Sequence, residues 1–447
     1  MSTVASYSHV PARQAALSRA GKAFIAVFLI IVLEGAVRKW VSSAATLPLL
    51  LARDLLAIYV IAYALRNGSL QRQKGIAQAL VAWSSLVIAW GLLQLVAGES
   101  SPTVLLIGLR FWLLYIWFGV AAAATMNEAD YRAAMRVAVW TLLLMAPLVV
   151  MQHFAPPGAR INSQIDGDEG DVFLVIADVV RTTGTFSFTA GFTTYLALMS
   201  PLVFAVAGAR KRTSRQRLFG AALFAAFVVT SMVSGSRAAV ILAGLMVLAF
   251  FVGRLGLARG RARTGALVGV IGGLVLLGLL LYAFSGAIAI TGQRFQEASE
   301  VEDFWERLLT VFIGQSVAFD QFTWLGYGIG LGSNLATYTR TGSTGAFALA
   351  EVEASRILLE GGLIGYVFTA FKVAVIAIGV RKSLKLSSRL HSAYPILLWL
   401  VVSLAILTWS AIGQLTAHGL LGIMLAFGLL LFRHPTVEFF PPRNSSA

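Results

Sequence analysis

Two arginines stand where the chain could bind an anion. Arg237 lies in the short SGSRAA turn between two apolar runs, and Arg181 opens the segment RTTGTFSF just before another run. In both places a helix is expected to begin soon after the arginine, so its free amide groups and dipole would add to the guanidinium charge. We predict that both arginines bind a phosphate or carboxylate. The alternatives are a contact with lipid headgroups for Arg237 and pairing with nearby acids for Arg181.

Acidic residues in EVEASRILLEGG could supply a general base. If a helix already starts near residue 350, then Glu353, Arg356 and Glu360 share one face and can satisfy one another. Glu351 then lies on a different face, free to take a proton from a substrate hydroxyl. We predict Glu351 as the catalytic base, or failing that Glu353. The alternative for Glu351 is an acid in a solvated loop.

Arg110 is a different kind of candidate, because it lies inside an apolar run about two turns from the end of that run. An ionised side chain at membrane depth is costly, so it is usually paired or functional. Glu34, Arg53 and Asp54 also occur within or beside apolar runs. We expect these three residues to form structural ion pairs.

Cysteine and metal chemistry are not expected. The chain has no Cys, which excludes disulfides, thiolate metal ligands and a Cys nucleophile. His153 and His418 lack a second His or a carboxylate at metal-ligand spacing. The run GYGIGLG at 326–332 has neither the preceding strand nor the following Lys-Ser/Thr of a phosphate loop, so we interpret it as a flexible turn. We expect no cofactor and no metal.

The elements that carry these residues are predicted to be membrane helices. Hydrophobic residues make up 58% of the 447 and charged residues only 12%, against about a quarter in soluble domains. Apolar runs of roughly 17 to 23 residues recur, each long enough to cross a bilayer. We predict an all-α integral membrane protein with about twelve spans, the last two being either two spans or one span and a re-entrant piece. The expected spans are 23–41, 47–65, 76–97, 103–125, 130–153, 189–209, 217–234, 238–254, 265–285, 360–380, 395–411 and 415–432.

Basic clusters between the apolar runs predict the orientation, because cytoplasmic loops carry an excess of Lys and Arg. The net charge of +15 is concentrated in such clusters, so nucleic acid is not an expected partner. The expected organisation is a cytoplasmic tail at 1–22 without a removable signal peptide, spans one to nine within 23–285 with an external loop at 154–188, a large external loop at 286–359, spans ten to twelve within 360–432, and a cytoplasmic tail at 433–447.

On the external side nearly all cations are arginine, whose planar guanidinium can bind phosphate in a bidentate manner. We infer an anionic ligand on this side, with Arg110 and Arg356 as further candidates beside Arg181 and Arg237. Within the large loop, apolar residues of 301–312 recur at helical spacing between charged ones, which predicts an amphipathic surface helix. This helix either caps the bundle or cradles a lipid substrate at the interface.

Several motifs occur in an order that resembles one known family. The segments RTTGTFSFTAGF, SGSRAA, FWERLL followed by WLGYGIGLGSN, and LLEGGLIG are similar to those of the O-antigen ligase and O-antigen polymerase family. The resemblance covers residues 180–365 on a frame of about twelve spans. In addition, EGAVRKW at 34–40 with LARD at 51–54 looks like a branch of exopolysaccharide polymerases.

The resemblance implies a membrane-embedded glycosyltransferase (GT-C-like) bundle in the bacterial inner membrane, with both termini cytoplasmic and the active site periplasmic. It implies metal-independent, inverting glycosyl transfer from an undecaprenyl-diphosphate-linked oligosaccharide, with Arg181 and Arg237 at the diphosphate. The implied partners are the lipid-linked donor and acceptor, the lipid bilayer, a flippase and a chain-length regulator protein.

The chain differs from the family at one significant position. The family's ligases carry a His, usually followed by Asn, nine residues before the Glu of the E-x-G motif, and this chain has Glu351 nine residues before Glu360. A carboxylate can also deprotonate a hydroxyl, so we expect a polysaccharide polymerase, with an O-antigen ligase as the first alternative. A twelve-helix secondary transporter is the alternative from another class, although the two halves of the chain are not similar to each other. A structural partner in an envelope polysaccharide complex is the third reading.

Overall fold

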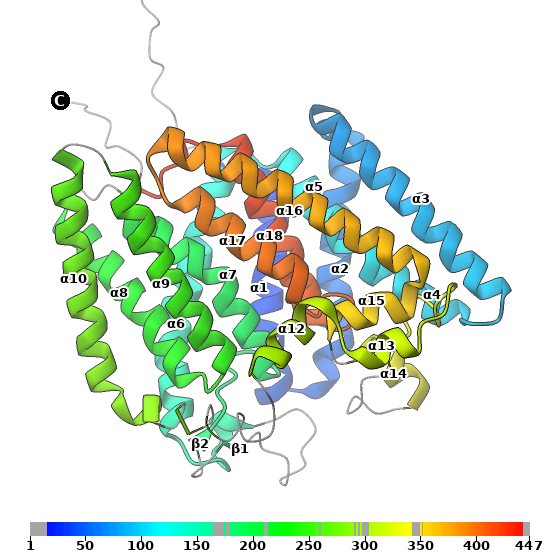
Figure 1. Cartoon of the computed structure of the whole chain (residues 1–447), viewed down its shortest axis with the longest axis horizontal. Helices are drawn as coiled ribbons and strands as arrows, with labels where there is room; N and C mark the ends of the chain where they lie inside the picture. The colour runs from blue at the N-terminus through cyan, green and yellow to red at the C-terminus, as the bar shows by residue number, and fades with distance from the viewer. Residues whose placement is uncertain are drawn as a thin grey trace, which may run out of the picture.

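The computed structural model describes residues 16–163, 174–175, 179–209, 213–258, 261–289, 292–293, 296, 304–341, 349–350 and 352–440. Long helices dominate these residues and pack side by side in one bundle (Figure 1). Eleven helices of the described part are long and apolar enough to cross a membrane. The helical membrane architecture predicted from the apolar runs is thus confirmed.

The first half of the bundle follows the predicted spans closely. The structure has a continuous span of α4, the π-helical turn η3 and α5, which extends from Pro102 to Thr125. Short 3-10 turns and a two-residue antiparallel strand pair lie in the connections. The elements are α1 (Arg19–Trp40), η1 (Ser43–Ala45), α2 (Thr46–Arg66), η2 (Ser69–Gln73), α3 (Lys74–Val96), α4 (Pro102–Leu109), η3 (Arg110–Leu114), α5 (Tyr115–Thr125), α6 (Glu128–Phe154), η4 (Arg160–Asn162), β1 (Leu174–Val175), β2 (Val179–Val180), α7 (Thr189–Gly208), α8 (Ser214–Val233), α9 (Arg237–Leu257) and α10 (Arg261–Ala283).

Among the described residues of the second half, four short helices precede the last spans. These elements are α12 (Phe304–Ile313), α13 (Ser316–Asp320), α14 (Asn334–Thr341), α15 (Glu353–Gly361), α16 (Leu363–Leu390), α17 (Tyr394–Thr408) and α18 (Leu415–Arg433). The last two apolar runs form separate helices, but α17 has only 15 residues and is shorter than the eleven candidate spans. It packs against both α16 and α18, so it belongs to the bundle.

The expected helix around residue 350 differs from the structure. α15 does not continue into the tenth span, because Gly362 adopts φ 56° and separates it from α16. The span therefore begins at Leu363 rather than at 360. The N–H of Leu363 instead bonds to the carbonyl of Trp324 at 2.9 Å, which ties the break to the loop before α14.

Small residues let the central helices approach closely. On α5 and α18, a Cβ at Gly119 would lie 2.8 Å from the carbonyl oxygen of Gly422, and a Cβ at Gly422 would lie 2.7 Å from that of Tyr115. Such contacts are the usual means of helix association in membranes, where lipid competes with apolar side chains. Nearby, the ring of Phe368 on α16 stacks on Trp112, with centroids 5.0 Å apart, which fixes the indole near the site described below.

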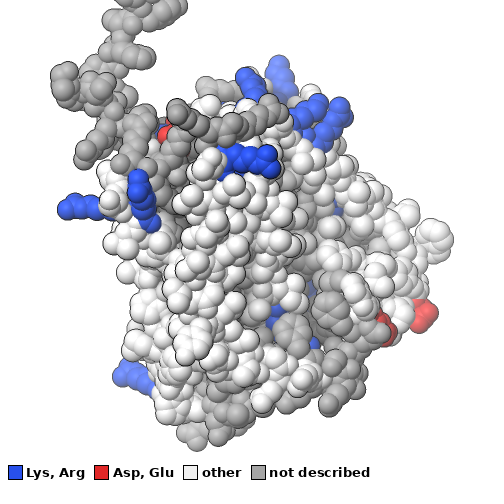
Figure 2. Space-filling view, turned by 60° about the vertical axis from the view of Figure 1, so that its left-hand side comes forward, with Lys and Arg blue, Asp and Glu red and all other residues white. Residues whose placement is uncertain are grey.

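The two ends of the bundle differ in charge. Figure 2 shows Lys and Arg side chains gathered over one end, above a broad belt without charge. This end, called the basic end, includes the α2–α3 turn, the start of α8 and the α16–α17 turn. The opposite end carries α12 to α15 and is called the α15 end (Figure 1). Its assignment to the periplasm stays a prediction.

Candidate functional site

The segment RTTGTFSF lies against the last turns of α1 at the α15 end. Lys39 Nζ donates a hydrogen bond to Thr183 Oγ1 at 2.8 Å, and Arg38 Nη1 donates to Ser187 Oγ at 3.3 Å. A Cβ at Gly35 would overlap the backbone of the segment, so glycine permits the close approach. The motifs EGAVRKW and RTTGTFSF therefore form one structural unit.

The turn that carries Arg237 joins this unit. Thr182 Oγ1, next to Arg181, donates to the carbonyl oxygen of Val233 at 3.3 Å, four residues before Arg237. Ser236 caps α9 through its side chain, and Arg237 is the first residue of the helix, which begins one residue earlier than the predicted span. Arg181 is exposed and Arg237 is half-buried. The structure thus brings the segments of both predicted anion-binding arginines together.

An ionic network lies between α1, α2 and η3, with Glu34 and Arg53 buried and Asp54 and Arg110 half-buried. Arg53 Nη1 is 3.0 Å from Glu34 Oε1, while Asp54 receives Arg110 Nε at 2.6 Å and Arg110 Nη2 at 3.1 Å. Tyr115 also donates to Asp54 at 3.1 Å. The ion pairs expected for Glu34, Arg53 and Asp54 are confirmed. Arg110 is held by a bidentate bond to Asp54, a partner that the sequence did not identify.

The acidic residues of α15 are fully buried. Glu353 is 3.6 Å from Arg356 Nη1 and 3.9 Å from Lys372 Nζ, and it accepts the N–H of Ile412 at 3.1 Å. Burial raises the pKa of Glu353, although Lys372 and Arg356 oppose this effect. Arg356 also donates to the carbonyl of Ala350 at 2.7 Å. Both side chains are buried and are engaged by groups of the protein.

The i, i+3, i+7 face is confirmed for Glu353 and Arg356, whereas Glu360 makes its hydrogen bonds elsewhere and interacts with Arg356 through its charge. The carboxylate of Glu360 accepts Trp112 Nε1 at 2.9 Å and the backbone N–H groups of Gly330 and Gly332, each at 2.8 Å. Burial raises the pKa of Glu360 to about 7, and these hydrogen bonds only partly offset it. The GYGIGLG run is therefore an anchored turn and not the flexible one expected from its glycines.

Two polar residues of this region were missed by the sequence reasoning. Gln94 is buried in α3, where it donates to the carbonyls of Leu325 and Glu360 at 2.7 and 2.8 Å and accepts the N–H of Ile329 at 2.9 Å. Lys372 lies inside α16 and pairs with Glu353 across the helix interface. Each is an isolated polar residue in a long apolar run, a signal that could have identified them.

The connection between α17 and α18 links both clusters. Besides the bond from Ile412 to Glu353, the carbonyl of Gly413 accepts the N–H of Asn334 at 3.0 Å. Immediately afterwards, the carbonyl of Leu415 accepts Arg53 Nη2 at 3.1 Å. The α1–α2 network and α15 are thus braced against the same short loop.

Two further predictions concern the large loop. Glu351 lies outside the described residues, as do residues 301–303. α12 is present from Phe304, and its apolar side chains Trp305 and Leu309 are 68% and 56% exposed. The predicted amphipathic helix is therefore confirmed, with an apolar face that is open to its surroundings.

Comparison with known proteins does not assign this arrangement to a family. No protein-family model matches the chain, and no curated protein is significantly similar to it.

Proposed function

We propose that this chain is a membrane-embedded glycosyltransferase that joins undecaprenyl-diphosphate-linked oligosaccharide repeat units into an exopolysaccharide or O-antigen. The observation that carries the proposal is the meeting of EGAVRKW, RTTGTFSF and SGSRAA at one end of the bundle. Their cations Arg38, Lys39, Arg181 and Arg237 lie where the spanning helices end, the level at which a lipid diphosphate has its head group.

In the proposed reaction the bond between the anomeric carbon and a diphosphate oxygen breaks, and its electron pair leaves with the diphosphate. Arg181 and Arg237 stabilise the charge that develops on this leaving group, an electrostatic effect that is commonly the largest in catalysis. An acceptor sugar hydroxyl attacks from the opposite face and inverts the anomeric carbon. Glu351 takes the proton of that hydroxyl. The products are a lengthened glycan and undecaprenyl diphosphate.

The fixed position of α15 supports a base placed just before it. At its first residue, Glu353 is held by Lys372 and the N–H of Ile412. Near its end, Glu360 is held by the N–H groups of the glycine turn. Catalytic groups need such rigid support, because small displacements from the productive geometry strongly reduce rates.

A reaction with purified protein and a purified lipid-linked oligosaccharide tests the proposal. We expect release of undecaprenyl diphosphate together with a ladder of polymer lengths. A single transfer to a different acceptor would instead indicate a ligase. Absence of diphosphate release, with proton-dependent uptake of a solute by the same protein in vesicles, would replace the proposal with transport.

The base is tested by paired substitutions. Glu351→Gln should abolish polymer formation while expression and thermal stability stay unchanged, because the amide cannot accept the proton. Glu353→Gln should mainly lower stability, since it leaves Lys372 and Arg356 buried without their carboxylate partner. If Glu351→Gln is active while Glu353→Gln is folded but inactive, the catalytic base is Glu353 and not Glu351.

A further inference from the structure

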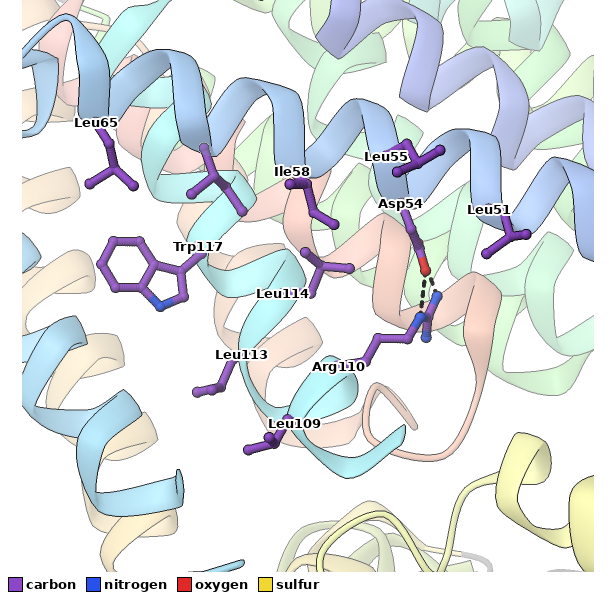
Figure 3. A pocket seen from close by; sticks show the side chains of 11 residues that line it. Leu51, Asp54, Leu55, Ile58, Leu65, Leu109, Arg110, Leu113, Leu114 and Trp117 are labelled. Carbon is purple, nitrogen blue, oxygen red and sulfur yellow. Dashed lines mark hydrogen bonds and ion pairs between the residues drawn. The ribbon is translucent and has the colours of Figure 1, made fainter. Parts of the chain in front are cut away.

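An apolar groove runs along the membrane-facing side of α2 and of the α4–α5 span (Figure 3). Its volume is about 560 Å³. One wall is formed by α2 with Leu51, Leu55, Ile58 and Leu65, and the other includes Leu113 and Trp117. Leu55 and Leu65 are 65% and 58% exposed, so the groove is open to lipid along its length.

The groove is longer than one leaflet of the hydrocarbon core. From Leu51 to Leu65, α2 rises about 21 Å at ~1.5 Å per residue. One leaflet contributes only about 15 Å, half of the ~30 Å core. An acyl chain of an ordinary phospholipid stays within its own leaflet, whereas a longer hydrocarbon chain would fill the whole groove.

The end of the groove nearest the α15 end is polar, because Asp54 and Arg110 lie there (Figure 3). Arg110 uses Nε and Nη2 to bind Asp54, while its Nη1 is buried and has no hydrogen-bond partner among the described residues. Arg110 is also the first residue of the π-helical turn η3. Such turns are rare and are often found at functional sites.

We propose that this groove binds the polyprenyl chain of a lipid carrier, with a phosphate oxygen of its head group accepting a hydrogen bond from Arg110 Nη1. This inference rests on the proposed function, which supplies the carrier. A long single chain matches the length of the groove, and a phosphate matches the remaining guanidinium donor, because charge-assisted hydrogen bonds are the strong ones. The bidentate bond to Asp54 holds the guanidinium of Arg110 at this end of the groove.

Photocrosslinking of the full-length protein in phospholipid nanodiscs tests where the polyprenyl chain binds. The probe is undecaprenyl phosphate with a diazirine in its hydrocarbon chain. Crosslinks are expected in the peptides that contain residues 51–65 and 109–117, and unlabelled undecaprenyl phosphate should suppress them. Crosslinks confined to other helices, or equal suppression by the same concentration of phosphatidylglycerol, would overturn the inference.

The contribution of the head group, to which Arg110 is proposed to bind, is tested from the side of the ligand, which avoids leaving Asp54 unpaired. Undecaprenol has the same chain without the phosphate. It should compete with the probe about tenfold less well than undecaprenyl phosphate, a loss typical for a hydrogen bond to a charged group. Equal competition by the two lipids would remove Arg110 from the head-group site.

A matched pair of variants tests the groove itself. Ile58 lines the groove and is 49% exposed, and Ile88 on α3 is 41% exposed but lies outside it. Ile58→Trp should raise the probe concentration for half-maximal crosslinking by about tenfold, because the indole fills the space of the chain. Ile88→Trp should leave it unchanged, with equal thermal midpoints showing that both proteins are folded. An unchanged value in Ile58→Trp would contradict the inference.

Binding and reaction can fail separately. Crosslinking in the groove without any polymer formation would support the polyprenyl-binding groove and refute the proposed function. If Ile58→Trp forms polymer at the wild-type rate and with the wild-type half-saturating concentration of lipid-linked oligosaccharide, the proposed function is supported and the polyprenyl-binding groove is refuted.

Discussion

Arg237 combines a guanidinium with the first turn of a capped helix, and its proposed role depends on shape as well as charge. Arg237→Lys keeps the charge but loses the planar fork that binds two phosphate oxygens. We expect the rate of undecaprenyl diphosphate release to fall about a hundredfold, the size usual for loss of one transition-state donor. The rate is measured at saturating lipid-linked donor with purified protein.

The control for this substitution is Arg254→Lys, in the last turn of the same helix at the basic end. Arg254 Nη1 bonds only weakly, at 3.3 Å, to the carbonyl of Ala207, so its replacement should leave the rate within about twofold of wild type. If Arg237→Lys behaves like the control, Arg237 does not bind the leaving diphosphate.

Glu360 should make the stability of the protein depend on pH. Its pKa is about 7 when folded, above the ordinary value of 4.5, because burial disfavours the ionised form. The protonated form of Glu360 therefore stabilises the folded state. This contribution is fully present below about pH 4.5 and is lost as the pH rises toward 7. We therefore expect the thermal midpoint of the wild type to fall between these pH values, as followed by unfolding scans in detergent.

Glu360→Gln removes this titration and should flatten the profile between about pH 4.5 and 7. It should also lower the midpoint at every pH, because one glycine N–H would face an amide NH₂, and a buried unsatisfied donor costs ~1–3 kcal/mol. The raised pKa of Glu353 should leave a residual slope in this variant. A profile as steep as that of the wild type would show that Glu360 is not the titrating group.

At the residue scale, the sequence identified the chemistry of single side chains better than their partners. The arginines at 181 and 237 were found because each stands close to an expected helix start. The pairing of Arg110 with Asp54, and of Glu353 with Lys372, joins residues on different helices, so local spacing holds no information about it. The hydrogen-bond partners of Glu360, Trp112 and the glycine turn, were missed for the same reason, because they lie far from it in the sequence.

The glycine turn is the element that fixes α15 against α4. Gly330 has φ 95°, and a Cβ there would overlap the backbone of Gly108 and Val104. Gly330→Ala should therefore destabilise the protein by ~2 kcal/mol or more, from left-handed backbone strain and overlap together. The thermal midpoint of the purified protein reports the loss.

Gly278→Ala on α10 is the matched control, because a Cβ at this position meets no atom within 4 Å. Alanine is favoured over glycine in a helix by about 0.5–1 kcal/mol, so this variant should be as stable as the wild type or slightly more stable. Equal midpoints for Gly330→Ala and Gly278→Ala would mean that the turn does not anchor α15.

Element boundaries in the apolar runs were largely predictable, and those in the large loop were not. α1 to α10 fall within a few residues of the predicted spans, because about twenty apolar residues in a row leave helix as the only way to satisfy the backbone in lipid. The break between α15 and α16 was hidden, since Gly361 and Gly362 interrupt a pattern that otherwise continues at helical spacing. The break is accompanied by the hydrogen bond from Leu363 to Trp324, and this contact between distant parts of the sequence could not be predicted from local spacing.

At the scale of the whole molecule, the site depends on how the helices alternate between the two ends. α1 and α8 are far apart in the sequence, yet Lys39 on α1 and Val233 on α8 both bond to the RTTGTFSF segment, because each intervening pair of helices returns to the same end. The sequence predicted this convergence only through the alternation of basic loops. Residue-level contacts, such as those of Lys39 with Thr183, could not be derived from alternation alone.

The alternation itself is tested by the labelling of single cysteines, which the absence of native Cys makes straightforward. Glu99→Cys lies in the α3–α4 turn at the α15 end, and Asn67→Cys lies in the α2–α3 turn at the basic end, both at exposed positions. In cells with a permeabilised outer membrane, an impermeant maleimide should label Glu99→Cys directly and Asn67→Cys only after the inner membrane is disrupted, because basic loops stay in the cytoplasm. Equal labelling of both would mean that α3 does not cross the membrane. A reversed pattern would put Arg181 and Arg237 on the cytoplasmic side, where the proposed periplasmic polymerisation could not take place.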